Sequence, residues 1–142
     1  MDNYKNLDPT ILDMSASYDK NHTYSVPYFY GTLGLLYNKT TIDAKTVSSW
    51  NCLWDPTYED EIIMENSVRD TFAPALISKG YSLNDTDENH LREALDILKK
   101  QKDDKIVYAY YVDETADAMI GEEASIALCY SGEAALAMAE ND

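Results

Sequence analysis

Polar and acidic side chains follow a short apolar run near the middle of the sequence. The run IIM at 62–64 is followed by Glu65, Asn66, Ser67 and Asp70. If the run is a buried strand, these side chains lie at its carboxyl end, where the next helix begins. Open α/β sheets bind their ligands beyond the carboxyl ends of strands. This junction is therefore a candidate binding edge, with oxygen atoms that can accept hydrogen bonds from a cation.

A second junction of the same kind follows the run ALC at 127–129. It offers Tyr130, Ser131 and Glu133, so an aromatic ring joins a hydroxyl and an acid. Carboxylates supply charge and accept hydrogen bonds from an ammonium group, and the face of a ring attracts a cation. The two junctions together favour a site for a small amine.

The same side chains also have ordinary structural interpretations. Ser67 and Ser131 are expected to cap the helices that follow them. Asp70 and Glu133 would lie in first turns, where acids interact favourably with the helix dipole. The residue types alone leave both roles open.

Catalytic and metal-binding patterns are not recognisable in the sequence. His22 lies in a polar loop and His90 in the first turn of an exposed helix, so neither is placed to activate a nucleophile. Cys52 and Cys129 have no CxxC spacing and no nearby histidine, which argues against zinc. We expect two buried free thiols. Glycine motifs for phosphates and dinucleotides are absent. We therefore predict that the protein is not an enzyme and needs no cofactor or metal.

The composition indicates a folded, strongly acidic chain. Its 142 residues are 45% apolar, and 26 acids against 11 basic residues give a formal net charge of -15. A chain this apolar is long enough for a real hydrophobic core. Binding to nucleic acid would require clustered Lys and Arg, so that class is not favoured. The charge suits either solubility alone or the handling of cations.

Strand and helix patterns alternate from about residue 47 to the end of the sequence. We expect helices near Pro9 and at about 50–54, 67–79, 87–101, 115–120 and 132–140, with buried strands within 61–66, 106–112 and 124–130. The helix at 67–79 should present one apolar face, made by Val68, Phe72, Ala75 and Leu76. This order predicts a layered α/β domain with a mostly parallel sheet.

The segment 24–38, YSVPYFYGTLGLLYN, is rich in aromatic and branched residues and is expected to be extended. Pro27 excludes an ordinary central strand in its first half, so the segment is either a strand pair or one long bent strand. Most tyrosines should be half-buried sheet residues. Tyr30 is a candidate exception, because it precedes Gly31 at a predicted bend.

Three segments give the sequence a family resemblance. YSVPYFYGTLGLLYN, SSWNCLWDPTYEDEIIMENSVRDTFAPALISKGYSLNDTD and GEEASIALCYSGEAA resemble, in order, the spermidine/putrescine-binding proteins of bacterial ABC importers. The resemblance implies a type II periplasmic-binding-protein fold, in which two α/β lobes hold a polyamine between them. Residues 1–142 resemble only the second lobe, a three-layer α/β/α unit, with 24–31 as an interlobe crossing segment. The first lobe, the C-terminal segments and a leader are expected to lie outside this sequence.

The resemblance also assigns site residues. The family's acidic ligand falls on Asp70, and its ligand-stacking tryptophan falls on Tyr130. A second acid of the spermidine binders falls on Ser67, which removes one carboxylate and makes putrescine or another small amine as suitable as spermidine. Together with Tyr30, these residues form the expected ligand-binding set. The implied partners are a polyamine and a membrane permease, and the implied location is extracytoplasmic, either periplasmic or lipid-anchored. A receptor for another small solute and an acidic protein-interaction module without a small ligand are the alternatives.

Overall fold

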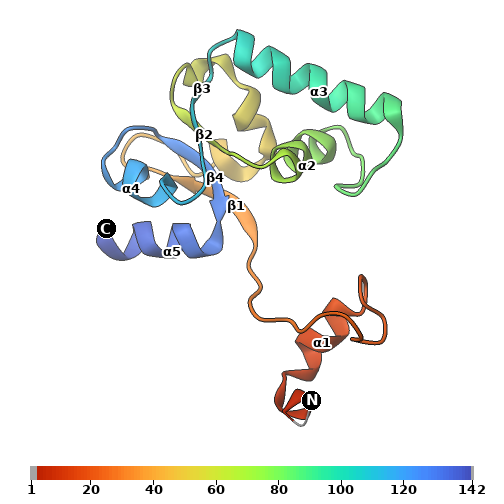
Figure 1. The fold of residues 1–142 in the computed structure, drawn as a ribbon. Coiled ribbons are helices and arrows are strands. Elements are labelled where there is room, and N and C mark those ends of the chain that lie inside the picture. The colour runs from red at the N-terminus through yellow and green to blue at the C-terminus, as the bar shows by residue number, and fades with distance from the viewer. Residues whose placement is uncertain (1–2, 142) are drawn as a thin grey trace. The chain divides into compact units, whose positions relative to one another are not determined.

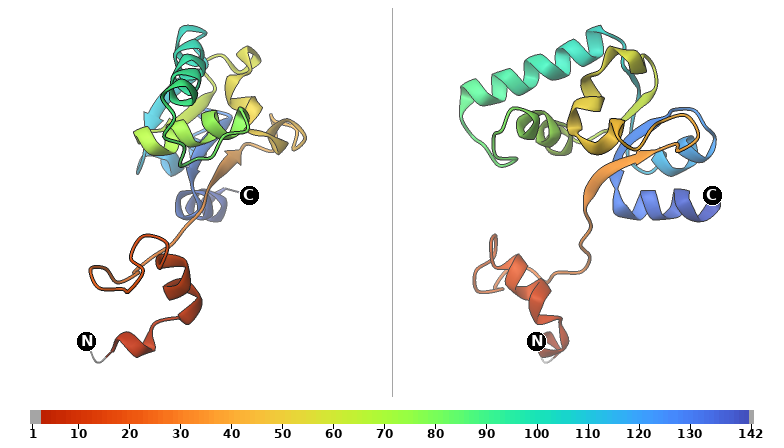
Figure 2. Two further views of the ribbon diagram at one scale, coloured as in Figure 1. Left: turned by 90° about the vertical axis from the view of Figure 1, so that its right-hand side faces the viewer. Right: turned by 180° about the vertical axis from the view of Figure 1, so that it is seen from behind.

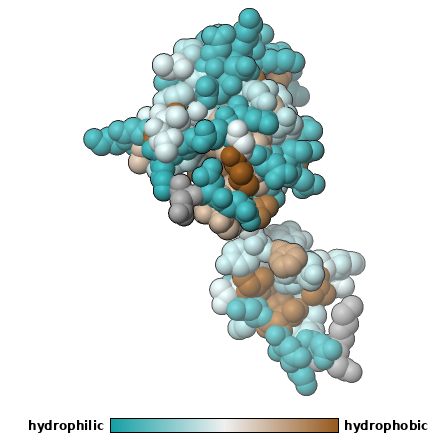
Figure 3. All heavy atoms as spheres, turned by 90° about the vertical axis from the view of Figure 1, so that its left-hand side faces the viewer, coloured by the Kyte–Doolittle hydropathy of each residue, from teal (hydrophilic) through white to brown (hydrophobic). Residues whose placement is uncertain are grey.

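The computed structural model describes residues 3–141. The chain divides into two compact units, Met1–Gly31 and Thr32–Asp142, which are considered separately. Within the described residues, no helix is both long enough and apolar enough to cross a membrane. Hydrophilic side chains cover most of the face of the Thr32–Asp142 unit that is seen in Figure 3, in keeping with the acidic composition.

The first unit contains one short helix and a loop organised by an aspartate. Helix α1 spans Pro9–Ser15, and the Asp8 carboxylate caps it by accepting from the Thr10 backbone N–H at 2.7 Å. Asp19 accepts backbone hydrogen bonds at 2.9–3.0 Å from three successive residues, Thr23, Tyr24 and Ser25. These hydrogen bonds, chiefly that from Tyr24, lower the pKa of Asp19 to about 2. The single turn η1, Tyr4–Asn6, precedes α1.

The second unit alternates strands and helices, as the pattern predicts. Its strands are β1 (Leu33–Tyr37), β2 (Ile62–Glu65), β3 (Val107–Tyr111) and β4 (Ile126–Tyr130). Its α-helices are α2 (Val68–Ser78), α3 (Glu88–Asp103), α4 (Thr115–Ile120) and α5 (Ser131–Glu140). Three 3-10 turns link β1 to β2: η2 (Thr46–Ser48), η3 (Trp50–Trp54) and η4 (Pro56–Tyr58).

The four strands form one sheet in the order β1-β4-β2-β3. Strand β2 is parallel to both β3 and β4, and only β1 runs antiparallel, against β4. The ribbon views place α2 and α3 over one face of the sheet and α4 and α5 over the other (Figures 1 and 2). The prediction of a three-layer α/β unit with a mostly parallel sheet is confirmed.

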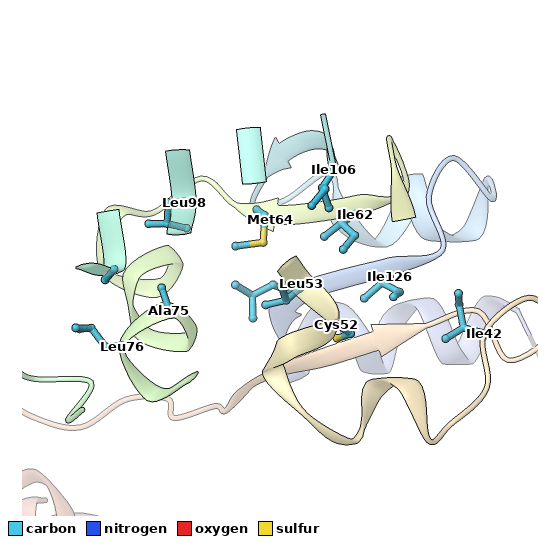
Figure 4. Packing of buried hydrophobic residues seen from close by; sticks show 12 residues of the cluster. Ile42, Cys52, Leu53, Ile62, Met64, Ala75, Leu76, Leu98, Ile106 and Ile126 are labelled. Carbon is cyan, nitrogen blue, oxygen red and sulfur yellow. The ribbon is translucent and has the colours of Figure 1, made fainter. Parts of the chain in front are cut away.

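The larger core fills the face under α2 and α3. Alternation along β2 directs Ile62 and Met64 to this face, and Figure 4 shows them beside Leu53 and Ile126. Leu53, Ile62 and Met64 are all fully buried. Ile63 points to the opposite face, where a smaller cluster forms against α4 with Ala118, Met119, Ala124 and Ala127. β2 is buried on both faces, in keeping with the unbroken apolar run of its first three residues, 62–64.

Helix α2 begins and ends as its sequence predicts. Ser67 is the N-cap, and its side chain accepts a hydrogen bond from the Asp70 backbone N–H. The helix stops before Gly80, whose φ of +83° is a left-handed conformation that glycine adopts without strain. Pro74 lies inside the helix and has no N–H, so the Asp70 carbonyl loses its usual helical donor. The predicted apolar face was wrong at Val68, which is 80% exposed in the first turn.

Two further expectations were wrong. The segment 24–38 is neither a strand pair nor one long strand, since only Leu33–Tyr37 finds a partner, on β4. Ser131 does not cap α5. Helix α5 starts at Ser131 itself, and the Ser131 hydroxyl accepts from the Thr32 backbone N–H at 3.3 Å. The two cysteines are buried and free, as predicted.

Candidate functional site

Three of the four predicted site residues meet at the carboxyl edge of the sheet. The Ser67 hydroxyl and the Tyr130 hydroxyl both donate to Oδ2 of Asp70, each at 2.6 Å. Among residues 3–141, no group donates a hydrogen bond to the other carboxylate oxygen, Oδ1. Asp70 and Ser67 are half-buried, and Tyr130 is 37% exposed. Two neutral hydroxyl donors thus fix the orientation of the Asp70 carboxyl group.

The topology of the sheet explains why these residues meet. Strands β2 and β4 are parallel neighbours, so their carboxyl ends lie side by side. Asp70 comes from the first turn of α2, directly after β2, and Tyr130 is the last residue of β4. Alternation along β4 puts Tyr130 on the same face as Leu128, which is the face that α2 covers. The phenol therefore reaches across to the first turn of α2.

The hydrogen bond to Asp70 also changes the acidity of the phenol. It raises the pKa of Tyr130 to about 12, with smaller effects of burial and of the Asp70 charge. Because ionising the phenol would destroy the hydrogen bond and place two negative charges together, the donor stays protonated at any physiological pH. Tyr130 therefore acts as a permanent neutral donor and as an aromatic surface.

Glu65 is the residue whose role the sequence did not reveal. It is the last residue of β2, and its side chain is 0% exposed. Among the described residues, neither of its carboxylate oxygens has a hydrogen-bond partner of normal geometry. Burial raises the pKa of Glu65 to about 7, and the negative charges of Asp70 and Glu133 add to the effect. The nearby backbone N–H of Tyr130 offsets it slightly. The sequence contained one signal for the burial of Glu65. Side chains alternate along a strand, so Glu65 lies on the same face of the sheet as Ile63.

The other polar groups of the two junctions lie around this edge. Glu133 is half-buried in the first turn of α5, and its Oε2 is buried without a hydrogen-bond partner. Asn66 is exposed, and its backbone N–H donates to the Tyr111 carbonyl at 2.9 Å. Within residues 3–141, no group of three or more His, Cys, Asp or Glu side chains is arranged to hold a metal ion.

Tyr30, the fourth predicted residue, belongs to the Met1–Gly31 unit. Its side chain is 71% exposed. It is one of three consecutive exposed aromatic residues, Tyr28, Phe29 and Tyr30. A part for Tyr30 in the site stays a prediction.

A hollow of the second unit lies away from this edge. It has a volume of about 740 Å³ and runs between α2, α3 and the segment that joins them, with Phe72, Leu83 and Leu91 in its wall. Ser67, Asp70 and Tyr130 do not line it. The hollow is therefore separate from the carboxyl edge and its acidic centre.

Comparisons with known proteins agree with this geometry. The family model of the bacterial extracellular solute-binding proteins matches residues 1–142. The chain is 35% identical over 135 residues to the spermidine/putrescine-binding periplasmic protein of Salmonella typhimurium, which covers 95% of the chain and 38% of that protein. The chain therefore spans well under half of that relative's length.

Solved structures show the same relationship. A spermidine/putrescine ABC transporter protein from Listeria monocytogenes is 40% identical and superposes with a TM-score of 0.88, over 98% of this chain and 42% of that chain. The substrate-binding protein of a spermidine/putrescine ABC transporter from Streptococcus pneumoniae is 34% identical, with a TM-score of 0.81 over 97% of this chain and 41% of that chain. The Salmonella and Streptococcus relatives are, by name, binding proteins.

Proposed function

We propose that this chain, which belongs to the family of bacterial extracellular solute-binding proteins, is one lobe of a receptor that captures a polyamine for an ABC importer. The relatives named above bind spermidine and putrescine. The proposal transfers that class of ligand to this chain, and the carboxyl edge of the sheet supplies the chemistry for it.

The observation that carries the proposal is the Asp70 carboxylate held between two hydroxyl donors. Ser67 and Tyr130 fix its orientation without neutralising it, and Oδ1 receives no hydrogen bond from the described residues. An ammonium group needs an oriented negative acceptor and gains from a nearby ring face. An anionic solute would instead be repelled by Asp70 and by the formal net charge of -15.

The exposure of this edge, where the Tyr130 side chain is 37% exposed, fits a lobe that supplies half of a binding site. A polyamine would lie on the surface at Ser67, Asp70 and Tyr130 and be enclosed when a second lobe closes over it. The segment 24–31 would be the connection between the lobes, and Tyr30 on it would complete the aromatic contacts. Closure would be a hinge motion stabilised by contacts with the ligand from both sides.

The location and the partners follow from the family. The full-length receptor would work outside the cytoplasm, in the periplasm or anchored to the cell surface by a lipid, and would deliver its ligand to a membrane permease. The recognition chemistry needs no cofactor, and the acidic charge does not suit nucleic acid.

The test is calorimetric titration of the two-lobe protein with putrescine, spermidine and spermine. We expect micromolar or tighter binding of at least one of them, weakened at least about 30-fold by Asp70→Asn, because removing a charged partner costs about 2 kcal/mol or more. Asp96→Asn is the matched control, since it removes the same charge from an exposed position on α3. It should leave the affinity within about twofold.

Two other outcomes would be informative. Absence of heat with every polyamine would contradict the proposal and point to a receptor for another solute, with Ser67 in place of an acid as the first position to examine. Unchanged affinity in Asp70→Asn would keep the ligand class but reject this site. The 142-residue chain alone should bind the same polyamine far more weakly than the two-lobe protein, because half of the contacts are missing, and equal affinity would reject the two-lobe model.

A further inference from the structure

Glu65 is a buried acid without a partner at the edge of the sheet that carries the proposed site. Its side chain is 0% exposed, and within residues 3–141 no hydrogen bond of normal geometry reaches either carboxylate oxygen. An ionised carboxylate in this position loses its hydration and has only the nearby Tyr130 backbone N–H to stabilise it, which costs much free energy. Unpaired buried polar groups are rare in native proteins and have an identifiable cause when they occur.

The charges that act most strongly on Glu65 are all negative. Asp70 on α2, Glu133 on α5 and Asp113 after β3 each disfavour its ionised form. The neighbouring strand β4 contributes two further titratable groups, the Cys129 thiol and the Tyr130 phenol, and the charge of Glu65 raises the pKa of both. Glu65 is thus surrounded by groups that hold it neutral while the edge carries no cation.

We propose that Glu65 is a specificity-determining residue of the amine site: its carboxyl is neutral while the site is empty and gives up one proton to solvent when a cationic amine binds beside Asp70. This inference rests on the proposed function. Glu65 has no exposed surface, so it acts through its charge and not by touching the ligand. The step is a simple ionisation, in which the O–H bond of the carboxyl breaks and the proton passes to the buffer.

The direction follows from Coulomb's law. An ammonium group near Asp70 offsets the negative charge that opposes ionisation of Glu65, and it attracts the new carboxylate in a region of low dielectric. The site then meets the cation with one more negative charge than the empty site had. A neutral analogue cannot drive this ionisation, so Glu65 makes the site select for positive charge.

Linkage fixes the pH dependence. Below the pKa of Glu65 in the empty site, each amine bound releases up to one proton, so affinity falls by up to about tenfold per pH unit as the pH is lowered. Above that pKa Glu65 is already ionised, and it adds no further pH dependence. The pKa of Glu65, about 7, puts this change in an experimentally accessible pH range.

Calorimetry of the two-lobe protein with putrescine can measure the affinity and the number of protons released on binding. The titrations would run from about pH 5.5 to about pH 8.5, in two buffers that differ in ionisation enthalpy. Putrescine is the probe because its alkylammonium groups, like that of lysine, stay protonated over this range. Glu65→Gln keeps the size of the side chain and removes the proton. His90→Gln is the control, since His90 is a titratable side chain on α3 whose hydrogen bond with Asp85, at 2.9 Å, raises its pKa.

The wild type and His90→Gln should release up to one proton per putrescine below neutral pH, and Glu65→Gln should release none and bind with an affinity independent of pH. Equal proton release in the wild type and Glu65→Gln would overturn the inference while leaving the proposed function standing. No binding of putrescine, spermidine or spermine by any variant at any pH would instead overturn the proposed function, and the inference with it.

A second measurement covers the case in which Glu65→Gln does not fold. The infrared difference spectrum of the wild type at about pH 6, with and without putrescine, should lose a protonated carboxyl band and gain carboxylate bands. A spectrum without that exchange would show that Glu65 keeps its proton in both states, as a purely structural acid would, and would overturn the inference.

Discussion

The Tyr130 hydroxyl and the Asp70 carboxylate, 60 residues apart in the sequence, are joined by a hydrogen bond of 2.6 Å to Oδ2. The bond connects the end of strand β4 to the first turn of helix α2, across the carboxyl edge of the sheet. It links the electrostatics of the two residues, because Asp70 both accepts the phenolic proton and opposes ionisation of the phenol.

Replacing Asp70 should therefore be visible in the titration of Tyr130. In Asp70→Asn we expect the pKa of Tyr130 to fall from about 12 toward the ordinary value of 10.0, since the negative charge is lost and an amide oxygen is a weaker acceptor than a carboxylate. NMR of the tyrosine Cζ carbons in alkaline solution can follow this residue among the 12 tyrosines. Asp96→Asn should leave the value unchanged, and an unaltered titration in Asp70→Asn would show that the two side chains are not coupled.

Ser67 should contribute more to stability than Ser131, although both serines stand at the start of a helix. Ser67 caps α2 and also donates to Asp70, whereas Ser131 makes no cap bond in α5. We expect Ser67→Ala to lower the free energy of unfolding by about 1 kcal/mol and Ser131→Ala by less than about 0.5 kcal/mol. Urea denaturation of both variants tests this, and equal losses would contradict the assignment of the caps.

Glu65→Gln should make the stability of the protein less sensitive to pH. Burial raises the folded-state pKa of Glu65 from 4.5 to about 7, so the native state binds more protons than the unfolded state between these values. The contribution of Glu65 to stability is thus fully present below about pH 4.5 and is lost as the pH rises through about 7. At about pH 8 the variant should be more stable than the wild type by on the order of 1–3 kcal/mol, and the difference should shrink toward about pH 5.

Denaturation with urea at several pH values measures this difference. Glu93→Gln on α3 is a suitable control, because Glu93 is exposed and bonded to the Tyr81 hydroxyl at the surface. It should show no comparable gain at high pH. A Glu65→Gln variant that is less stable than the wild type at about pH 8 would show that the carboxylate has a stabilising partner in solution.

The two thiols should be unreactive in the folded protein. Cys52 and Cys129 are buried, and burial raises the pKa of Cys129 to about 11, with the charges of Glu65 and Glu133 adding to the effect. Since the thiolate is the reactive species, labelling with an aromatic disulfide at about pH 8 should be slow in buffer and complete after addition of urea. Rapid labelling of the native protein would show that its core opens readily.

The comparison of sequence and fold is clearest along α2 and β4. The N-cap at Ser67, the stop at Gly80 and the buried runs at 62–65 and 126–130 were predictable, because each depends on neighbours close in the sequence. The exposure of Val68 was not predictable in this way. A residue in the first turn can have the spacing of the apolar face and still lie beyond the part of the sheet that the helix covers.

The segment 24–32 shows the limit of strand propensity. Its aromatic and branched residues favour extended backbone, but a strand also needs a partner for its hydrogen bonds. Within 24–38, only Leu33–Tyr37 pairs with β4. Ser131 shows a similar limit at a junction. Serine is a typical N-cap residue, but strand β4 ends at Tyr130 and helix α5 already begins at Ser131. The Ser131 hydroxyl therefore accepts a hydrogen bond from the Thr32 backbone N–H instead of capping the helix.

The sequence alone determined the fold class, the position of most elements and three side chains of the site, since periodicity, caps and the family motifs are local properties. Only the tertiary structure decided how those side chains are used. Strand order places the ends of β2 and β4 side by side, which joins Tyr130 to Asp70. The same packing buries Glu65 near Asp70, Glu133 and Asp113, and the last two of these acids are distant from Glu65 in the sequence.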